Sequence, residues 1–290
     1  MLWFRPQYWG VSSGALTATG KVLGGMLASI VFPLLTMHYT WRAVSYSLLF
    51  FGLILTVVNF YVIKDGPQDA CKETKVRLRF FLLSVAKAFS QPIVWALGVY
   101  GYAMYLVLSV FGETYAMGFL TQAGHTTRQQ AGLMSSLAFL GSAVGSFVIA
   151  YASDLWGNRK IFLCLGAVGA LIASSFVFFY PGLQYIYMAM AIFFFGFFSG
   201  AGVLVFVTAV EKSDTKTPGT LMSVVNCIVM SSGLVHNMLC GALIDVMRPY
   251  MERFHLPVTE YHVSFLSITL MLLIAVIISF SLKGSMSRKD

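Results

Sequence analysis

Three ionisable side chains interrupt long apolar runs of the sequence, namely Lys21, Glu113 and His236. A charged group inside the hydrocarbon of a membrane is costly, so such residues usually face a cavity or a partner and mark a path for solutes or ions. A lysine ammonium in that setting attracts an anionic group. A desolvated carboxylate or an imidazole binds and releases protons. These residue types therefore indicate non-covalent binding of a solute, of a proton, or of both.

Polar residues at helical spacing accompany each of the three groups. Ser13 and Thr17 precede Lys21 at intervals of four residues, so the three form one stripe on a helix. A second set runs through 102–113 at intervals of three and four residues, and a third through 226–237. The candidate substrate and proton residues are Lys21, Tyr102, Tyr105, Ser109, Glu113, Asn226, His236 and Asn237.

Each candidate also has a structural interpretation. Lys21 could form an ion pair between helices, and Glu113 could cap a broken helical turn in water. Asn226 could serve helix packing, and His236 could be a hydrogen-bonded histidine between helices. Residue types and spacing leave these alternatives open.

The elements that position these residues are membrane helices. Hydrophobic residues make up 58% of the 290-residue chain and charged residues 10%, with a mean hydropathy of +0.79, whereas soluble domains carry about 25% charged residues. A helix needs roughly 20 apolar residues to cross about 30 Å of hydrocarbon. Eight segments qualify: 9–35, 43–63, 90–119, 130–152, 161–180, 184–210, 219–244 and 262–282. Because lipid offers no partner to backbone polar groups, we expect an all-α integral membrane protein with eight transmembrane helices.

The basic residues are distributed unevenly between the two sets of loops. With the amino terminus inside, the external loops contain only Arg42, Arg128, Arg248 and Arg253, whereas the remaining loops and termini contain all other basic residues except Lys21. Positively charged loops remain in the cytoplasm. We therefore expect both termini to be cytoplasmic, and the net charge of +8 needs no nucleic acid to explain it.

Motifs of several other protein classes are missing. The sequence contains neither a phosphate-binding GxxxxGK[ST] loop nor an HExxH zinc motif, and its four cysteines form no CxxC pair. We therefore expect no enzymatic activity, no cofactor and no metal site. Glycine pairs at GxxxG spacing, such as Gly141/Gly145 and Gly196/Gly200, indicate instead that the helices pack closely in a bundle.

The connection after the fourth segment has a recognisable pattern, S153-D-L-W-G-N-R-K160. Asp154, Gly157, Arg159 and Lys160 resemble the second copy of the signature loop of the major facilitator superfamily. The glycine suits a tight turn, and the basic pair favours the cytoplasmic side. The aspartate at the helix end can pair with a cation of the neighbouring helix in one conformer only. The resemblance thus implies that these four residues act in gating.

Other segments extend the resemblance over nearly the whole chain. Trp41-Arg42 precedes the second span, a long polar connection follows that span, and the segments 195–211 and 218–226 look like the tenth and eleventh helices of bacterial permeases of this superfamily. Aligned in this way, the chain covers the fifth to twelfth helices, a partial major-facilitator fold. We expect residues 1–63 to be two helices of an amino-terminal half, residues 64–89 a cytoplasmic linker, and residues 90–290 a six-helix half.

The resemblance implies a permease of the inner, cytoplasmic membrane that moves a small polar or anionic solute by alternating access, with coupling to protons as one option. Its partners would be that solute, protons and the lipid bilayer, and it would be a monomer as a complete transporter. The alternative is a truncated membrane protein of the same family that does not transport.

The expected topology can be tested with reporter fusions at Gln68 and Arg253. The charge distribution predicts a cytoplasmic reporter at Gln68 and an external one at Arg253. Alkaline phosphatase and green fluorescent protein fusions report the two sides in opposite ways. If both positions report the same side, the number of spans is wrong.

Overall fold

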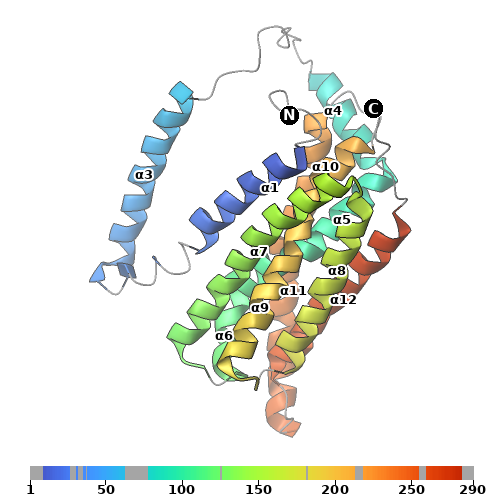
Figure 1. The fold of residues 1–290 in the computed structure, drawn as a ribbon. Coiled ribbons are helices and arrows are strands. Elements are labelled where there is room, and N and C mark those ends of the chain that lie inside the picture. The colour runs from blue at the N-terminus through green and yellow to red at the C-terminus, as the bar shows by residue number, and fades with distance from the viewer. Residues whose placement is uncertain are drawn as a thin grey trace.

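The computed structural model describes residues 9–26, 31, 35–36, 38–62, 78–124, 126–180, 182–212, 218–254 and 259–282. Every regular element in these ranges is a helix, which confirms the all-α class (Figure 1). Seven helices there are long and apolar enough to cross a membrane. The eighth expected span, 9–35, is described in its first half and at a few later residues, and residues 64–77 of the expected linker lie outside the description.

The helices follow the predicted segments closely. The amino-terminal part contains α1 (Trp9–Gly20), which continues as the π-helix η2 (Lys21–Met26), and α3 (Trp41–Val62). The six later spans are α5–η3–α6 (Pro92–Leu106, Val107–Tyr115, Ala116–Gln122), α7 (Arg128–Trp156), α8 (Arg159–Phe179), α9–η4–α10 (Tyr185–Ser199, Gly200–Val203, Leu204–Glu211), α11 (Pro218–Phe254) and α12 (Glu260–Ser281).

Two connections differ from the expectation. The end of the expected linker forms a helix, α4 (Leu78–Phe89), whose apolar residues from Phe80 onward pack near α5 and α11. The span expected at 219–244 is also longer than predicted, because α11 continues through Pro249 to Phe254. A proline removes only one helical hydrogen bond, and membrane helices tolerate that loss better than soluble ones.

Glycines bring α7 and α9 into direct backbone contact. A Cβ at Gly141 or Gly145 would collide with the backbone of Phe193 or Phe197, and one at Gly196 would collide with Ala138. Gly200 is packed equally tightly against α7. Both GxxxG pairs therefore serve helix packing, as small residues do where lipid provides no hydrophobic drive.

Aromatic side chains fill the other half of the bundle. Phe111 of η3 and Phe119 of α6 meet Phe178 of α8 and Phe265 of α12 with ring centroids 4.7 to 6.4 Å apart. Each of these rings is almost fully buried. Edge-to-face pairs of this kind add to the free energy of burial, so they fix the position of the α5–η3–α6 span.

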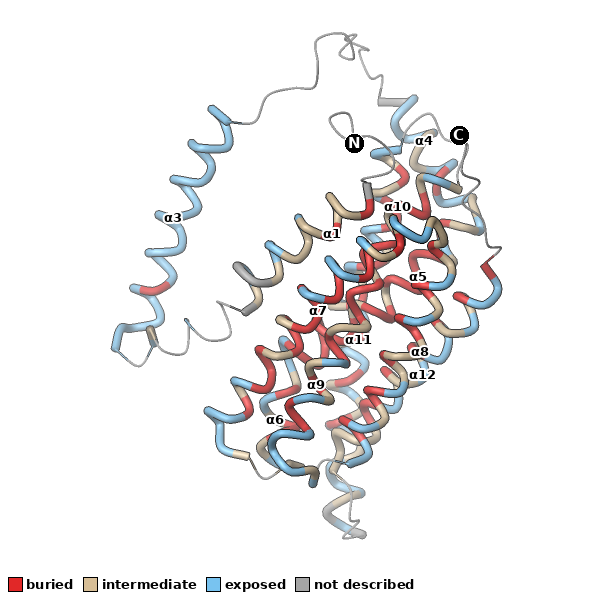
Figure 2. Tube along the Cα trace, in the orientation of Figure 1, coloured by how far each residue is buried: buried red, intermediate tan, exposed pale blue. Residues whose placement is uncertain are grey.

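The two amino-terminal helices are placed very differently. The α1 helix lies along α7, with Gly10 and Gly14 packed against Asp154, Ser146 and Ala150. The α3 helix stands apart from the bundle in Figure 1, and nearly all its side chains are exposed in Figure 2. Only α1 of these two can therefore contribute residues to a site in the bundle.

Candidate functional site

A charged cluster joins α7, α8 and α10 at one end of the bundle, here called the basic end. The Arg159 guanidinium forms an ion pair with Asp154 and a second with Glu211, in which Nη2 lies 3.0 Å from Oε1. Its Nη1 also donates to the Ser153 hydroxyl at 3.2 Å. Both Arg159 and Asp154 are almost completely buried. The guanidinium is thus neutralised by carboxylates of two helices, as a buried cation requires.

The same aspartate connects α1 to the bundle. The backbone N–H of Val11 donates to Asp154 Oδ2 at 2.6 Å. Val11 lies in the first turn of α1, where the N–H groups have no partner within the helix and the helix dipole favours a negative charge. Asp154 therefore fastens the start of α1 to the end of α7.

The turn between α7 and α8 holds this cluster in place. Gly157 ends α7 in the left-handed conformation at φ 63°, which glycine adopts without strain. Asn158 then caps α8 by accepting a hydrogen bond from the N–H of Ile161. Lys160 donates to the Phe280 carbonyl in the last turn of α12 at 2.8 Å. The four residues of the signature loop thus have distinct structural roles at the basic end.

Lys21 lies at the junction of α1 and η2 and reaches α7. Its Nζ donates to Ser142 Oγ at 2.7 Å and to Ser146 Oγ at 2.9 Å. Ser199 of α9 donates to Ser142 Oγ at 3.1 Å. These three buried serines are here called the serine cradle. Two of them hold the ammonium through neutral oxygens and Ser199 supports Ser142, while no carboxylate of the described residues lies within ion-pairing distance of the ammonium.

Glu113 lies in the π-helix η3, where each turn is wider than in an α-helix. The prediction that residues 102–113 share one α-helical face therefore fails here. Ser109 is buried, and its hydroxyl donates to the Tyr105 carbonyl at 3.0 Å, whereas Glu113 is exposed. Glu113 makes no ion pair with Lys21 in this conformation.

A single aromatic ring nevertheless links the neighbourhoods of Lys21 and Glu113. Phe139 of α7 contacts Gly25 of η2 on one side and Gly112 of η3 on another, so tightly that a Cβ at either glycine would press on the ring. Gly112 immediately precedes Glu113. The structure thus brings the two π-helical stretches, and with them both charges, to neighbouring places on α7.

His236 is the centre of a polar chain between α5, α11 and α12. Its Nδ1 lies 3.4 Å from the Tyr102 hydroxyl, and its Nε2 lies 2.9 Å from the Ser267 hydroxyl. Cys240 Sγ lies 3.8 Å from the same Ser267 oxygen. The histidine is buried. Both ring nitrogens have partners, so His236 of α11 links α5 to α12 through polar contacts.

Asn237 and Asn226 are placed differently on α11. The Asn237 amide donates to the Gly233 carbonyl at 2.8 Å and to the Ser109 carbonyl at 3.3 Å, which links α11 to η3. Its Oδ1 is buried and has no partner among the described residues. Asn226 is exposed and does not join this group.

Comparison with known proteins places this architecture in a family. A model of the Major Facilitator Superfamily matches residues 1–236 and 102–289. The chain belongs to the major facilitator superfamily. Two of its curated relatives are transport proteins by name and a third is a membrane sensor, and solute transport agrees with the helical bundle and its buried charges.

Individual relatives of this major facilitator chain are distant. A hexuronate transporter of Bacillus subtilis is 21% identical over 266 residues, which are 84% of this chain and 60% of that protein. The membrane sensor protein UhpC of Salmonella typhimurium is 23% identical, covering 71% of this chain and 50% of its own length. The sodium-dependent phosphate transport protein 1 of mouse is 24% identical, covering 51% and 34%. The chain therefore spans between about a third and three fifths of these relatives.

Several residues of this site were not predicted from the sequence. The serine cradle and Glu211 were not among the candidates, although Ser142 and Ser146 are polar residues four positions apart within an apolar span. That spacing places two hydroxyls on one helix face and was a usable signal. Nothing in the sequence marks Glu211 as the partner of Arg159, because 52 residues separate them.

The role of the cluster can be tested with Asp154→Asn. The amide still accepts from the Val11 N–H, but the negative charge that strengthens this hydrogen bond at the start of α1 is lost together with the ion pair to Arg159. The contact between α1 and α7 should therefore weaken by about 1–2 kcal/mol, or roughly 5- to 30-fold in conformer ratio. Spin labels at Leu16 and Leu155, both exposed, would report longer distances by double electron–electron resonance. Asp245→Asn, at an exposed carboxylate of α11, is the control.

Solute binding should change by less than about twofold in Asp154→Asn, since the cluster lies at the end of the bundle. Loss of binding without any change in the distance distribution would show that Asp154 contacts solute and does not act in gating.

Proposed function

We propose that this chain serves secondary transport of a small anionic solute by alternating access, with Lys21 as the residue that binds the negative charge. The observation that carries the proposal is the serine cradle. A buried lysine whose ammonium contacts only neutral hydroxyls has no opposite charge beside it, and an anion is the partner that would stabilise its charged form.

The position of Lys21 supports this assignment. Val11 and Lys21 are ten residues apart, which corresponds to about 15 Å along a helix, or about half the hydrocarbon thickness. Solute sites in secondary transporters lie near the middle of the bilayer. The depth of Lys21 in the bundle therefore supports its assignment to the solute site.

The relatives support the same chemistry in their own names. One is a hexuronate transporter and another a phosphate transport protein, and both named solutes are anions. An anionic solute would supply the negative charge that Lys21 lacks in the serine cradle. Sugar acids and phosphate-bearing solutes are the classes that we propose.

Gating would use the cluster at the basic end. Asp154 holds the start of α1 to α7 in this conformation, so α1 can separate from α7 at that end only when this hydrogen bond breaks. A solute that bound the two arrangements unequally would shift the balance between them. We assign the basic end to the cytoplasmic side, because its loops hold most of the basic residues.

The solute assignment predicts a specific effect of Lys21→Ala. Removal of a charge-assisted contact should weaken binding of glucuronate to the purified chain about tenfold or more, while glucose, a neutral sugar, should bind poorly to both forms. Calorimetry would measure both affinities, and uptake into liposomes would follow in parallel. Lys21→Arg retains the charge, and Lys87→Ala removes an exposed lysine of α4 as the matched control.

Unchanged glucuronate affinity in Lys21→Ala would leave that lysine as a structural residue and remove the reason for an anionic solute. Binding without uptake by the unmodified chain would favour the alternative of a non-transporting member of the superfamily.

Proton coupling is the second part of the proposal and rests on Glu113. Its exposed carboxylate lies in η3 directly after Gly112, which packs against the ring of Phe139 that also contacts η2. Glu113→Gln should abolish uptake driven by a pH gradient and retain solute exchange at equal pH, because the amide cannot carry a proton. A pH-gradient response equal to that of the unmodified chain would assign the proton to another group, with His236 as the next candidate.

A further inference from the structure

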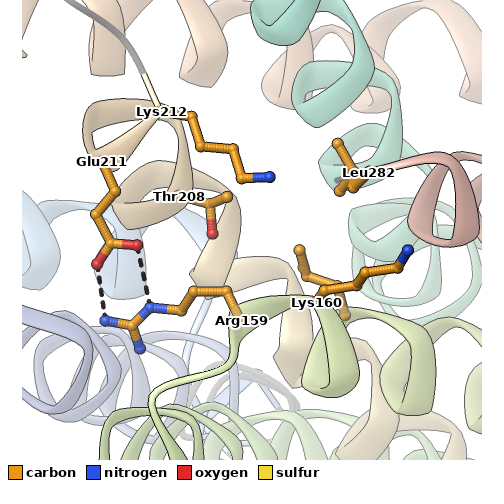
Figure 3. Close-up of a pocket in the computed structure, with 7 residues that line it drawn as sticks. Arg159, Lys160, Thr208, Glu211, Lys212 and Leu282 are labelled. Atoms are coloured by element: carbon orange, nitrogen blue, oxygen red, sulfur yellow. Dashed lines mark hydrogen bonds and ion pairs between the residues drawn. The ribbon is translucent and has the colours of Figure 1, made fainter. Parts of the chain in front are cut away.

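A narrow pocket lies at the basic end, beside Arg159 and Glu211. It is lined by the first turn of α8, the last turn of α10 and the residue after α12, including Lys160, Thr208 and Leu282. Figure 3 shows these side chains around the opening, with the Arg159 guanidinium turned away toward Glu211. The pocket is thus separate from the serine cradle and from the contact between α1 and α7.

The charges around this pocket are predominantly positive. Among the described residues, Arg159, Lys160 and Lys212 line it together with the carboxylate of Glu211, which is bound by Arg159 at 3.0 and 3.4 Å. Burial lowers the pKa of Lys212, and the positive charge of Lys160 lowers that pKa further, while the negative charge of Glu211 offsets part of this effect. The two ammonium groups therefore repel each other across the pocket, and an anion between them would relieve the repulsion.

A buried hydroxyl points to the same ligand chemistry. Thr208 is only 1% exposed, and its Oγ1 is buried without a hydrogen-bond partner among the described residues. Figure 3 shows this oxygen directed into the pocket. An unsatisfied buried hydroxyl costs about 1–3 kcal/mol, so a ligand oxygen that accepts its hydrogen would stabilise the site.

The surroundings of the pocket favour a lipid as the source of that anion. Lys160 is bonded to the Phe280 carbonyl, and the outer face of this end of α12 carries exposed apolar side chains, with Ile277 and Phe280 each 61% exposed. An acyl chain can lie along that face while its headgroup reaches the lysines. Basic pockets between helices at the cytoplasmic side of membrane proteins bind anionic headgroups in this manner.

We propose that this pocket binds the phosphate of an anionic phospholipid, with Lys160 and Lys212 facing its charge and Thr208 donating a hydrogen bond to one of its oxygens. The narrow opening admits a single phosphate oxygen, and the rest of the headgroup stays at the rim beside Leu282. The lipid would thereby be held where α8, α10 and α12 meet.

Native mass spectrometry of the purified full chain in a neutral detergent tests this site. Phosphatidylglycerol is titrated, and the retained lipids are counted for each variant. One tightly retained lipid is expected. Lys160→Gln and Thr208→Val should each weaken its retention about fivefold or more, as loss of one charge or one hydrogen bond would. Lys87→Gln and Thr269→Val, an exposed lysine of α4 and a threonine bonded within α12, are the matched controls and should stay within twofold.

Three results would overturn the proposal. An equal loss of lipid retention in Lys87→Gln would mean that the lipid is attracted to the basic face of the protein as a whole and not to this pocket. Displacement of the lipid by millimolar inorganic phosphate would identify a site for a soluble anion. Unchanged lipid retention in Thr208→Val would show that the Thr208 hydroxyl does not bind the phosphate and is hydrogen-bonded to water instead. Circular dichroism of each variant confirms that the helices are intact, and none of these readouts depends on solute transport.

Discussion

A charge buried in a membrane protein must find its partner within the protein, because hydrocarbon offers none. Asp154 and Arg159 meet this requirement by pairing, and the positions of several helices depend on that pair. The guanidinium needs two carboxylates from different helices, so α7 and α10 must both meet the first turn of α8. The aspartate in turn accepts the Val11 N–H, and this single contact sets where α1 begins against the bundle. The position of Val11 then also determines the depth of Lys21 in the bundle, because a helix has a fixed rise per residue.

Close packing and polar chemistry share the same interface between α7 and α9. Each cradle serine is a direct neighbour in sequence of a glycine that permits backbone contact: Ser142 follows Gly141, Ser146 follows Gly145, and Ser199 precedes Gly200. Because these backbones touch, the hydroxyls of Ser142 and Ser199 come within 3.1 Å of each other. Small residues thus bring the helices together and also concentrate the oxygens that hold Lys21.

The sequence was most informative where one physical property dominates. Apolar length defined the spans to within a few residues, and the spacing of Asp154, Gly157 and Arg159 identified the turn that Gly157 makes in the left-handed conformation. Hydroxyl pairing across helices was not predictable, since serine changes hydropathy little and its partner depends on packing. The π-helical register around Glu113 was missed because spacing arguments assume a regular turn. The helical continuation of α11 past Pro249 was missed because proline usually marks a boundary.

The π-helix η3 also affects how this span tolerates changes in length. In its wide turns, two carbonyls accept hydrogen bonds from side chains of other helices. Asn237 of α11 donates to the Ser109 carbonyl, and Ser135 of α7 donates to the Gly112 carbonyl at 2.7 Å. Deleting one residue between them would allow the wide turn to close into a regular α-helix, because a π-turn holds one residue more than an α-turn. The residues beyond it would keep their faces, and Phe119 would stay in the aromatic cluster that it forms with Phe178 and Phe265. The carbonyls of Ser109 and Gly112 would instead return to bonds within the helix, so this span would lose its polar contacts with α11 and α7 while its aromatic core stayed in place.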